Sequence, residues 1–105
     1  MSNSQNLQHH PLNNYFERLA ADTRLFSSHI ALFAALYYFS NDTNPCLPFQ
    51  VSRPKLMRFS RIKSIATYHK NISDLTRYGY IEYNPSWHPL KGTCVRLIIE
   101  DNQNS

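Results

Sequence analysis

The chain has 105 residues, a net charge of +4 and only two cysteines. This length suits one domain with a modest core, and two cysteines exclude a disulfide framework. The longest apolar run, residues 30–39, is about half the length of a membrane-spanning helix. The first residues lack the charged start and apolar stretch of a secretory signal. We therefore expect a soluble, cytoplasmic protein.

The charge is unevenly distributed along the chain. Residues 1–50 hold two basic and three acidic side chains, whereas residues 51–96 hold nine basic side chains and only two acids, Asp74 and Glu82. Such a concentration of positive charge favours a polyanionic partner. The alternative is a solvated basic face that binds nothing.

Residues 1–12 are polar and rich in Asn, Gln and His, which predicts a disordered N-terminal arm. Asn14 and Glu17 have the spacing of a capping box, so a first helix is expected from there to about residue 22. This helix is either a packing strap or a dimerisation arm.

A second helix is predicted over residues 29–39, capped by Ser27 or Ser28. Its residues are apolar nearly all round, which is typical of a central helix or of one in a subunit interface. We expect apolar surface here that is shared with a second copy of the chain.

The next segment predicts a strand, a helix and a turn. Alternation at residues 49–51 indicates a very short strand that pairs with a later hairpin. Ser52 is expected to cap a helix over residues 53–59, with Pro54 in its first turn. The side chains expected to point inward from this helix are Leu56, Met57 and Phe59, and residues 60–63 form the turn.

Residues 64–78 give the strongest helical pattern. Apolar residues spaced by three and four positions predict one buried stripe, formed by Ile65, Tyr68, Ile72 and Leu75. Gly79 stands where a helix C-terminus needs a residue that tolerates positive φ. Two β-rich runs follow, residues 80–83 and 94–99, separated by a ten-residue hairpin loop that contains two prolines.

This order predicts an α+β, mainly helical fold: a winged helix-turn-helix, with a three-helix core, a β-hairpin wing and one extra N-terminal helix. The domain is expected over residues 13–100, followed by a disordered tail at 101–105. Within it, residues 13–40 form the N-terminal helices and residues 50–99 the helix-turn-helix and wing.

The helix over residues 64–78 is the candidate recognition helix, because its face opposite the apolar stripe carries short polar and basic side chains near its start. Thr67 and Ala66 can contact thymine methyl groups, Asn71 can bond an adenine edge, and Lys70 can reach guanine. The candidate base-reading residues are Ser64, Ala66, Thr67, Lys70 and Asn71. The alternative is the solvent face of an ordinary amphipathic helix.

A basic run precedes this helix and contains no acid. Such cations grip the phosphate backbone, which positions a protein without reading sequence. The candidate phosphate-binding residues are Arg53, Lys55, Arg58, Arg61, Lys63 and Arg77, although Arg77 is also placed to form an ion pair with Asp74. The wing contributes His88, Lys91 and Arg96, while Trp87 either anchors the loop or stacks on nucleic acid.

Catalytic motifs are missing from the sequence: there is no HExxH, no GxSxG and no glycine-rich phosphate loop. The histidines and cysteines lack metal-ligand spacing. We expect no enzyme activity, no cofactor, no metal and no small-molecule ligand.

The run SRPKLMRFSRIKSIATYHKNISDLTRYGYI resembles the winged helix-turn-helix of the GntR and MarR type. The stretch SRIKSIATYHKNISDLTRYGYIEYNPSWHPLKGT is similar to small helix-turn-helix proteins of Bacteroidetes conjugative and mobilisable transposons. The resemblance covers about half the chain. Two departures are evident: the large GntR-type effector domain has no counterpart, and the region before residue 50 matches no dimerisation segment that we can name.

This resemblance implies a bacterial, dimeric protein that binds specific double-stranded DNA and controls transcription, or excision and transfer, of a mobile element. The first alternative is a winged helix that binds only proteins. The second is an excisionase-like architectural accessory, which would bend DNA without controlling a promoter.

Overall fold

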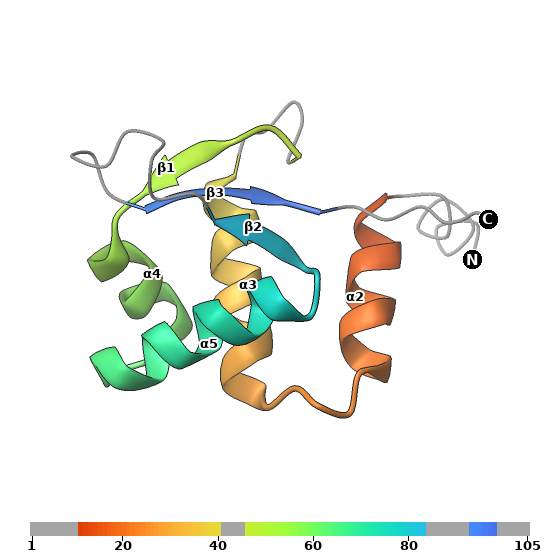
Figure 1. Ribbon diagram of the computed structural model, residues 1–105, viewed down its shortest axis with the longest axis horizontal. Coiled ribbons are helices and arrows are strands. Elements are labelled where there is room, and N and C mark those ends of the chain that lie inside the picture. The colour runs from red at the N-terminus through yellow and green to blue at the C-terminus, as the bar shows by residue number, and fades with distance from the viewer. Residues whose placement is uncertain (1–10, 41–45, 84–92, 99–105) are drawn as a thin grey trace, which may run out of the picture.

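The computed structural model describes residues 11–40, 46–83 and 93–98. Within these ranges the chain is α+β and mostly helical, as expected, with four helices and one three-stranded antiparallel sheet. Figure 1 shows the sheet along one side of helices α3, α4 and α5, with α2 at the end away from α4. The elements are α2 (Pro11–Ala21), α3 (Ser27–Phe39), β1 (Phe49–Val51), α4 (Arg53–Ser60), α5 (Ile65–Arg77), β2 (Ile81–Tyr83) and β3 (Thr93–Leu97).

The sheet has the strand order β1-β3-β2, so the last strand lies in the middle. Phe49 is paired with Val95, and Ile81 with Leu97. The predicted pairing of residues 49–51 with the later hairpin strands is therefore confirmed. β1 leads into α4, and β2 follows α5, so the sheet holds the ends of the helical pair α4 and α5 in place.

The core forms around α3. Leu32, Phe33, Ala35 and Leu36 are fully buried, which agrees with the continuous apolar sequence of this helix and the prediction that it is central. The interior also receives buried side chains from α2, α4, α5 and the sheet, including Leu19, Leu56, Leu75, Ile81 and Val95. No helix in the described ranges is long and apolar enough to cross a membrane.

The caps of α4 and α5 are the predicted serines. Ser52 Oγ accepts a hydrogen bond from the Lys55 backbone N–H at 3.3 Å, and Ser64 Oγ accepts one from that of Thr67 at 3.2 Å. Each bond satisfies one of the N–H groups that a helix start leaves unpaired. The turn between the two helices is therefore fixed on the α5 side by Ser64.

The starts of the first two helices differ from the prediction. α2 begins at Pro11, so Asn14 lies inside the helix and cannot cap it; proline is well suited to a first helical position. The α3 cap is Phe26 rather than a serine, and the Nδ1 atom of His29 accepts the Phe26 backbone N–H at 2.9 Å. His29 therefore makes the return bond of a capping box, to the backbone N–H of the N-cap residue, and the side-chain cap expected of Ser27 or Ser28 is not formed.

Gly79 ends α5 with φ +86°, as its position after the helix predicts. A Cβ atom there would lie 3.3 Å from Arg18 Nη2. That nitrogen donates to the backbone oxygens of Tyr78 and Gly79, each at 3.2 Å. Arg18 thus binds α2 to the corner between α5 and β2. This contact favours packing over dimerisation as the role of the first helix.

Several predictions lie outside the described residues. These are the disordered arm over residues 1–10, the greater part of the hairpin loop with Trp87, His88 and Lys91, and the tail at 101–105. Residues 11 and 12, expected to belong to the arm, are the first residues of α2.

Candidate nucleic-acid interface

Helix α5 presents one continuous face to solvent. Its exposed residues are Ile65, Ala66, His69, Lys70, Ser73, Thr76 and Arg77, while Tyr68, Asn71, Ile72, Asp74 and Leu75 are buried and Thr67 is half-buried. The outward face is rotated by roughly 50° about the helix axis from the face that the apolar stripe predicted. Ile65, expected in the buried stripe, is 50% exposed.

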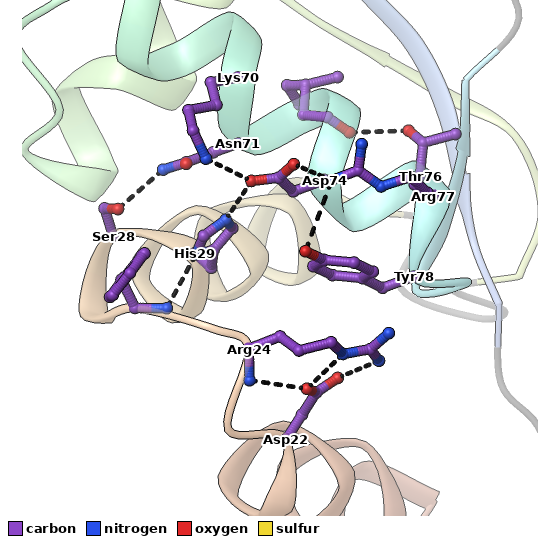
Figure 2. Close-up of polar contacts among 12 residues, drawn as sticks. Asp22, Arg24, Ser28, His29, Lys70, Asn71, Asp74, Thr76, Arg77 and Tyr78 are labelled. Carbon is purple, nitrogen blue, oxygen red and sulfur yellow. Dashed lines mark hydrogen bonds and ion pairs between the residues drawn. The ribbon is translucent and has the colours of Figure 1, made fainter.

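The assignment of Asn71 to base reading is wrong. Its side chain is buried, with only 2% of the residue exposed, and its amide donates to Ser28 Oγ at 2.8 Å (Figure 2). A base edge cannot reach an amide that faces the neighbouring helix. The cause of the error is physical: polar side chains that pair with α3 point inward, although their polarity alone favours the surface.

The other predicted base-reading residues remain accessible. Ser64, Ala66 and Lys70 are exposed and Thr67 is half-buried. His69 and Ser73, which the sequence did not place among the base-reading residues, lie at the centre of the exposed face. They follow Ile65 by four and eight positions, so the helical period would have found them had Ile65 been assigned to the surface.

Asp74 is the acidic residue of α5, and three basic side chains are bound to it. It is 5% exposed, and its carboxylate contacts His29 Nε2 and Lys70 Nζ at 2.9 Å and Arg77 Nη2 at 2.8 Å (Figure 2). The hydrogen bond from His29 and the Lys70 ammonium hold the pKa of Asp74 below its ordinary value, against the effect of burial. The expected ion pair between Asp74 and Arg77 is confirmed.

The predicted phosphate-binding cations of α4 and the turn are all exposed. They are Arg53, Lys55, Arg58, Arg61 and Lys63. Within the described part of the chain, none of the five forms an ion pair. Their charge is therefore available to a partner, in contrast to that of Lys70 and Arg77.

Arg61 ends α4 in the left-handed conformation, with φ 66° and ψ 20°. Non-glycine residues seldom adopt this conformation because Cβ crowds the following carbonyl oxygen. The chain here turns sharply from α4 toward Ser64, and it carries two exposed cations, Arg61 and Lys63, at the start of α5.

An open groove of about 520 Å³ lies beside this turn. Residues from the first turns of both α3 and α5 line it, where the positive ends of the helix dipoles lie. Its lining residues are Ser27, Ser28, Ala31, Ser60, Arg61, Ile62, Lys63, Ser64 and Thr67. Hydroxyl groups, cations and helix starts together make this surface suitable for anionic oxygens.

A second groove of about 420 Å³ lies between the exposed face of α5 and strand β2. It is lined by His69, Ile72, Ser73, Thr76, Arg77 and Tyr83. The exposed face of α5 is thus bordered by the turn at one end and by the sheet at the other.

The predicted wing lies only partly within the described residues. Arg96 on β3 forms an ion pair with Glu82 on β2, with Nε and Oε1 2.6 Å apart. The register places these residues directly opposite each other. His88 and Lys91, the other predicted wing contacts, lie outside the described residues.

The described residues contain no cluster of three His, Cys, Asp or Glu side chains that could hold a metal ion. Cys94 is buried, which raises the pKa of its thiol, and Cys46 is half-buried; the two do not form a disulfide with each other. Comparison with protein-family models, curated proteins and solved structures gives no match for this chain.

Proposed function

We propose that this protein is a winged helix-turn-helix that binds duplex DNA, with α5 in the major groove and the cations of α4 and the turn on the phosphates. The observation that carries the proposal is the set of five exposed cations, free of acidic partners in the described ranges, beside the exposed face of α5. The strand order β1-β3-β2 and the sequence of elements β1-α4-α5-β2-β3 support the winged form.

Within this proposal the two sets of residues have different tasks. Phosphate contacts supply most of the affinity and position the protein, whereas contacts to base edges supply the sequence preference. The base-reading set is Ser64, Ile65, Ala66, Thr67, His69, Lys70 and Ser73. The isoleucine and alanine offer apolar contact to thymine methyl groups, and the polar side chains offer hydrogen bonds.

The resemblance of the TYHK and PSWHP segments extends the proposal to regulation of transcription in a mobile genetic element. No enzymatic step belongs to this function. We also propose that the protein acts as a homodimer, through the N-terminal helices. Tyr38 at the end of α3 is 66% exposed and stacks on Phe59 of α4, with ring centroids 4.9 Å apart. Exposed aromatic residues of this kind are typical anchors of protein interfaces.

The salt dependence of DNA binding tests the phosphate contacts. With about six contacts, affinity should fall by roughly three orders of magnitude between 50 and 200 mM salt. Replacing Arg53, Arg58 and Lys63 by glutamine should reduce the slope of log K against log salt concentration by about 2.7, which is 0.9 for each contact.

Arg24→Gln is the control for this experiment, because it removes a guanidinium that is already bound to Asp22 at 2.6 Å. It should leave the slope unchanged. An unchanged slope in the triple variant would contradict the assignment of these cations to the phosphates.

A further inference from the structure

Both cations of α5 are bound to the same buried carboxylate. Lys70 and Arg77 have side chains that are 66% and 64% exposed, yet each contacts Asp74. The cations of α4 and the turn have no such partner in the described ranges. On the helix proposed to read bases, two cations therefore share one carboxylate, which offsets part of their positive charge.

His29 of α3 holds the Asp74 carboxylate in place. The backbone N–H of Phe26 can only donate, so the His29 Nδ1 atom that accepts it carries no proton. In the neutral imidazole the proton is then on Nε2, which donates to Asp74 Oδ2 at 2.9 Å. Asp74 consequently stays where it is when Lys70 and Arg77 move toward a ligand.

The ion pairs with Asp74 should have different effects on binding to random DNA and on binding to the correct site. Non-specific binding gains its free energy from cations that neutralise phosphates. A cation that must first leave Asp74 gains little from a phosphate, and the uncovered carboxylate then repels the DNA. At the correct site, the hydrogen bonds that Lys70 and the rest of the base-reading face form with base edges offset this cost.

We propose that Asp74 is a specificity-determining residue: it withholds Lys70 and Arg77 from non-specific DNA and yields them only to the correct site. The inference rests on the proposed DNA-binding function. Asp74 itself touches no DNA and acts by positioning the two cations.

Asp74→Asn tests the proposal with little disturbance of the core, because an amide oxygen can still accept the hydrogen bond from His29 Nε2. The variant frees Lys70 and Arg77. Binding to a mixed-sequence 30-base-pair duplex should strengthen at 50 mM salt. The slope of log K against log salt should become steeper by about 1.8, for two added phosphate contacts.

Two further variants separate electrostatics from packing. In the Asp74→Asn background, Lys70→Gln with Arg77→Gln should return the slope to that of the unmodified protein. In the unmodified background, the same pair of substitutions should leave the slope on mixed-sequence DNA nearly unchanged. This second measurement is made with Asp74 present, so it stays decisive even if Asp74→Asn fails to fold.

The outcomes distinguish the two proposals. If the unmodified protein does not bind the duplex at 50 mM salt, the proposed function is wrong, and this inference with it. If it binds, but Asp74→Asn leaves the slope unchanged, or Lys70→Gln with Arg77→Gln lowers it by about 1.8 with Asp74 present, the inference alone is overturned.

Discussion

Tyr80 shows how single side chains tie the helices of this protein to its sheet. The residue is 1% exposed, and its hydroxyl donates to Asp22 Oδ2 at 2.8 Å. The Arg18 guanidinium lies over its ring, 4.1 Å from the centroid. One tyrosine immediately before β2 therefore binds Arg18 within α2 and Asp22 just after it.

This environment makes stability sensitive to alkaline pH. Burial, and then the hydrogen bond to Asp22, raise the pKa of Tyr80 to about 12 from an ordinary value of 10.0. A raised pKa in the folded state contributes stability that is complete below pH 10 and is lost as the pH rises toward 12. The phenolate is the form that the folded protein disfavours.

Tyr80→Phe should therefore be less stable than the unmodified protein at pH 8, by about 1 kcal/mol for the lost hydrogen bond. Between pH 10 and 12 its free energy of unfolding should decline less. Denaturant unfolding at a series of pH values measures both effects. Parallel curves for the two proteins over that interval would contradict this account of Tyr80.

Two other buried side chains, Asn71 and Asp74, show what the sequence could not reveal. Their buried positions depend on Ser28 and His29, which lie 43 and 45 residues earlier in the chain. Local periodicity carries no information about such partners. Local polarity therefore predicts the surface for both residues, whereas the structure buries them against α3.

For whole helices and strands, local signals were more informative. Caps at Ser52 and Ser64, the stop at Gly79 and β-rich runs on either side of the loop located α4, α5 and the strands to within one or two residues. Phe59 of α4 is an exception. It was expected to point inward, but it is 43% exposed, because it lies against Tyr38 and Phe39 at the end of α3 rather than in the core.

Because Asn71 is buried and His69 is exposed on α5, we expect substitutions of the two residues to have opposite effects. Asn71→Ala removes a buried hydrogen bond and should lower the free energy of unfolding by about 1–3 kcal/mol. His69→Ala changes an exposed side chain, so its stability should stay within about 0.5 kcal/mol, while its preference among DNA sites should change. Thermal unfolding and competition between DNA sites provide the two measurements.

The opposite outcome would contradict the outward face of α5 described above. If Asn71→Ala is fully stable and alters site preference, while His69→Ala has no effect on DNA binding, then the face that reads bases is the one the apolar stripe indicated.

Over the molecule as a whole, the cations and the exposed aromatic surface meet on α4. The cations without an acidic partner in the described ranges lie on α4 and the turn, and the exposed ring stack joins the end of α3 to Phe59 at the end of α4. In the dimer that we propose, a two-fold axis would bury this patch on both copies and would place two α5 helices for a palindromic site.

Tyr38→Ser should therefore shift the protein from dimer toward monomer in sedimentation analysis. Phe26→Ser is the matched control, since Phe26 is 68% exposed but lies at the opposite end of α3. A dimer unaffected by Tyr38→Ser would rule out this patch as the interface.

The proposed function depends above all on whether the exposed face of α5 reads the sequence of duplex DNA. Selection of bound sites from a pool of random duplexes at moderate salt tests this directly. We expect enrichment of one motif, palindromic if the protein is a dimer, and a changed motif for His69→Ala. Recovery of random sequences without enrichment would contradict base reading and would favour a protein-binding role for the same fold.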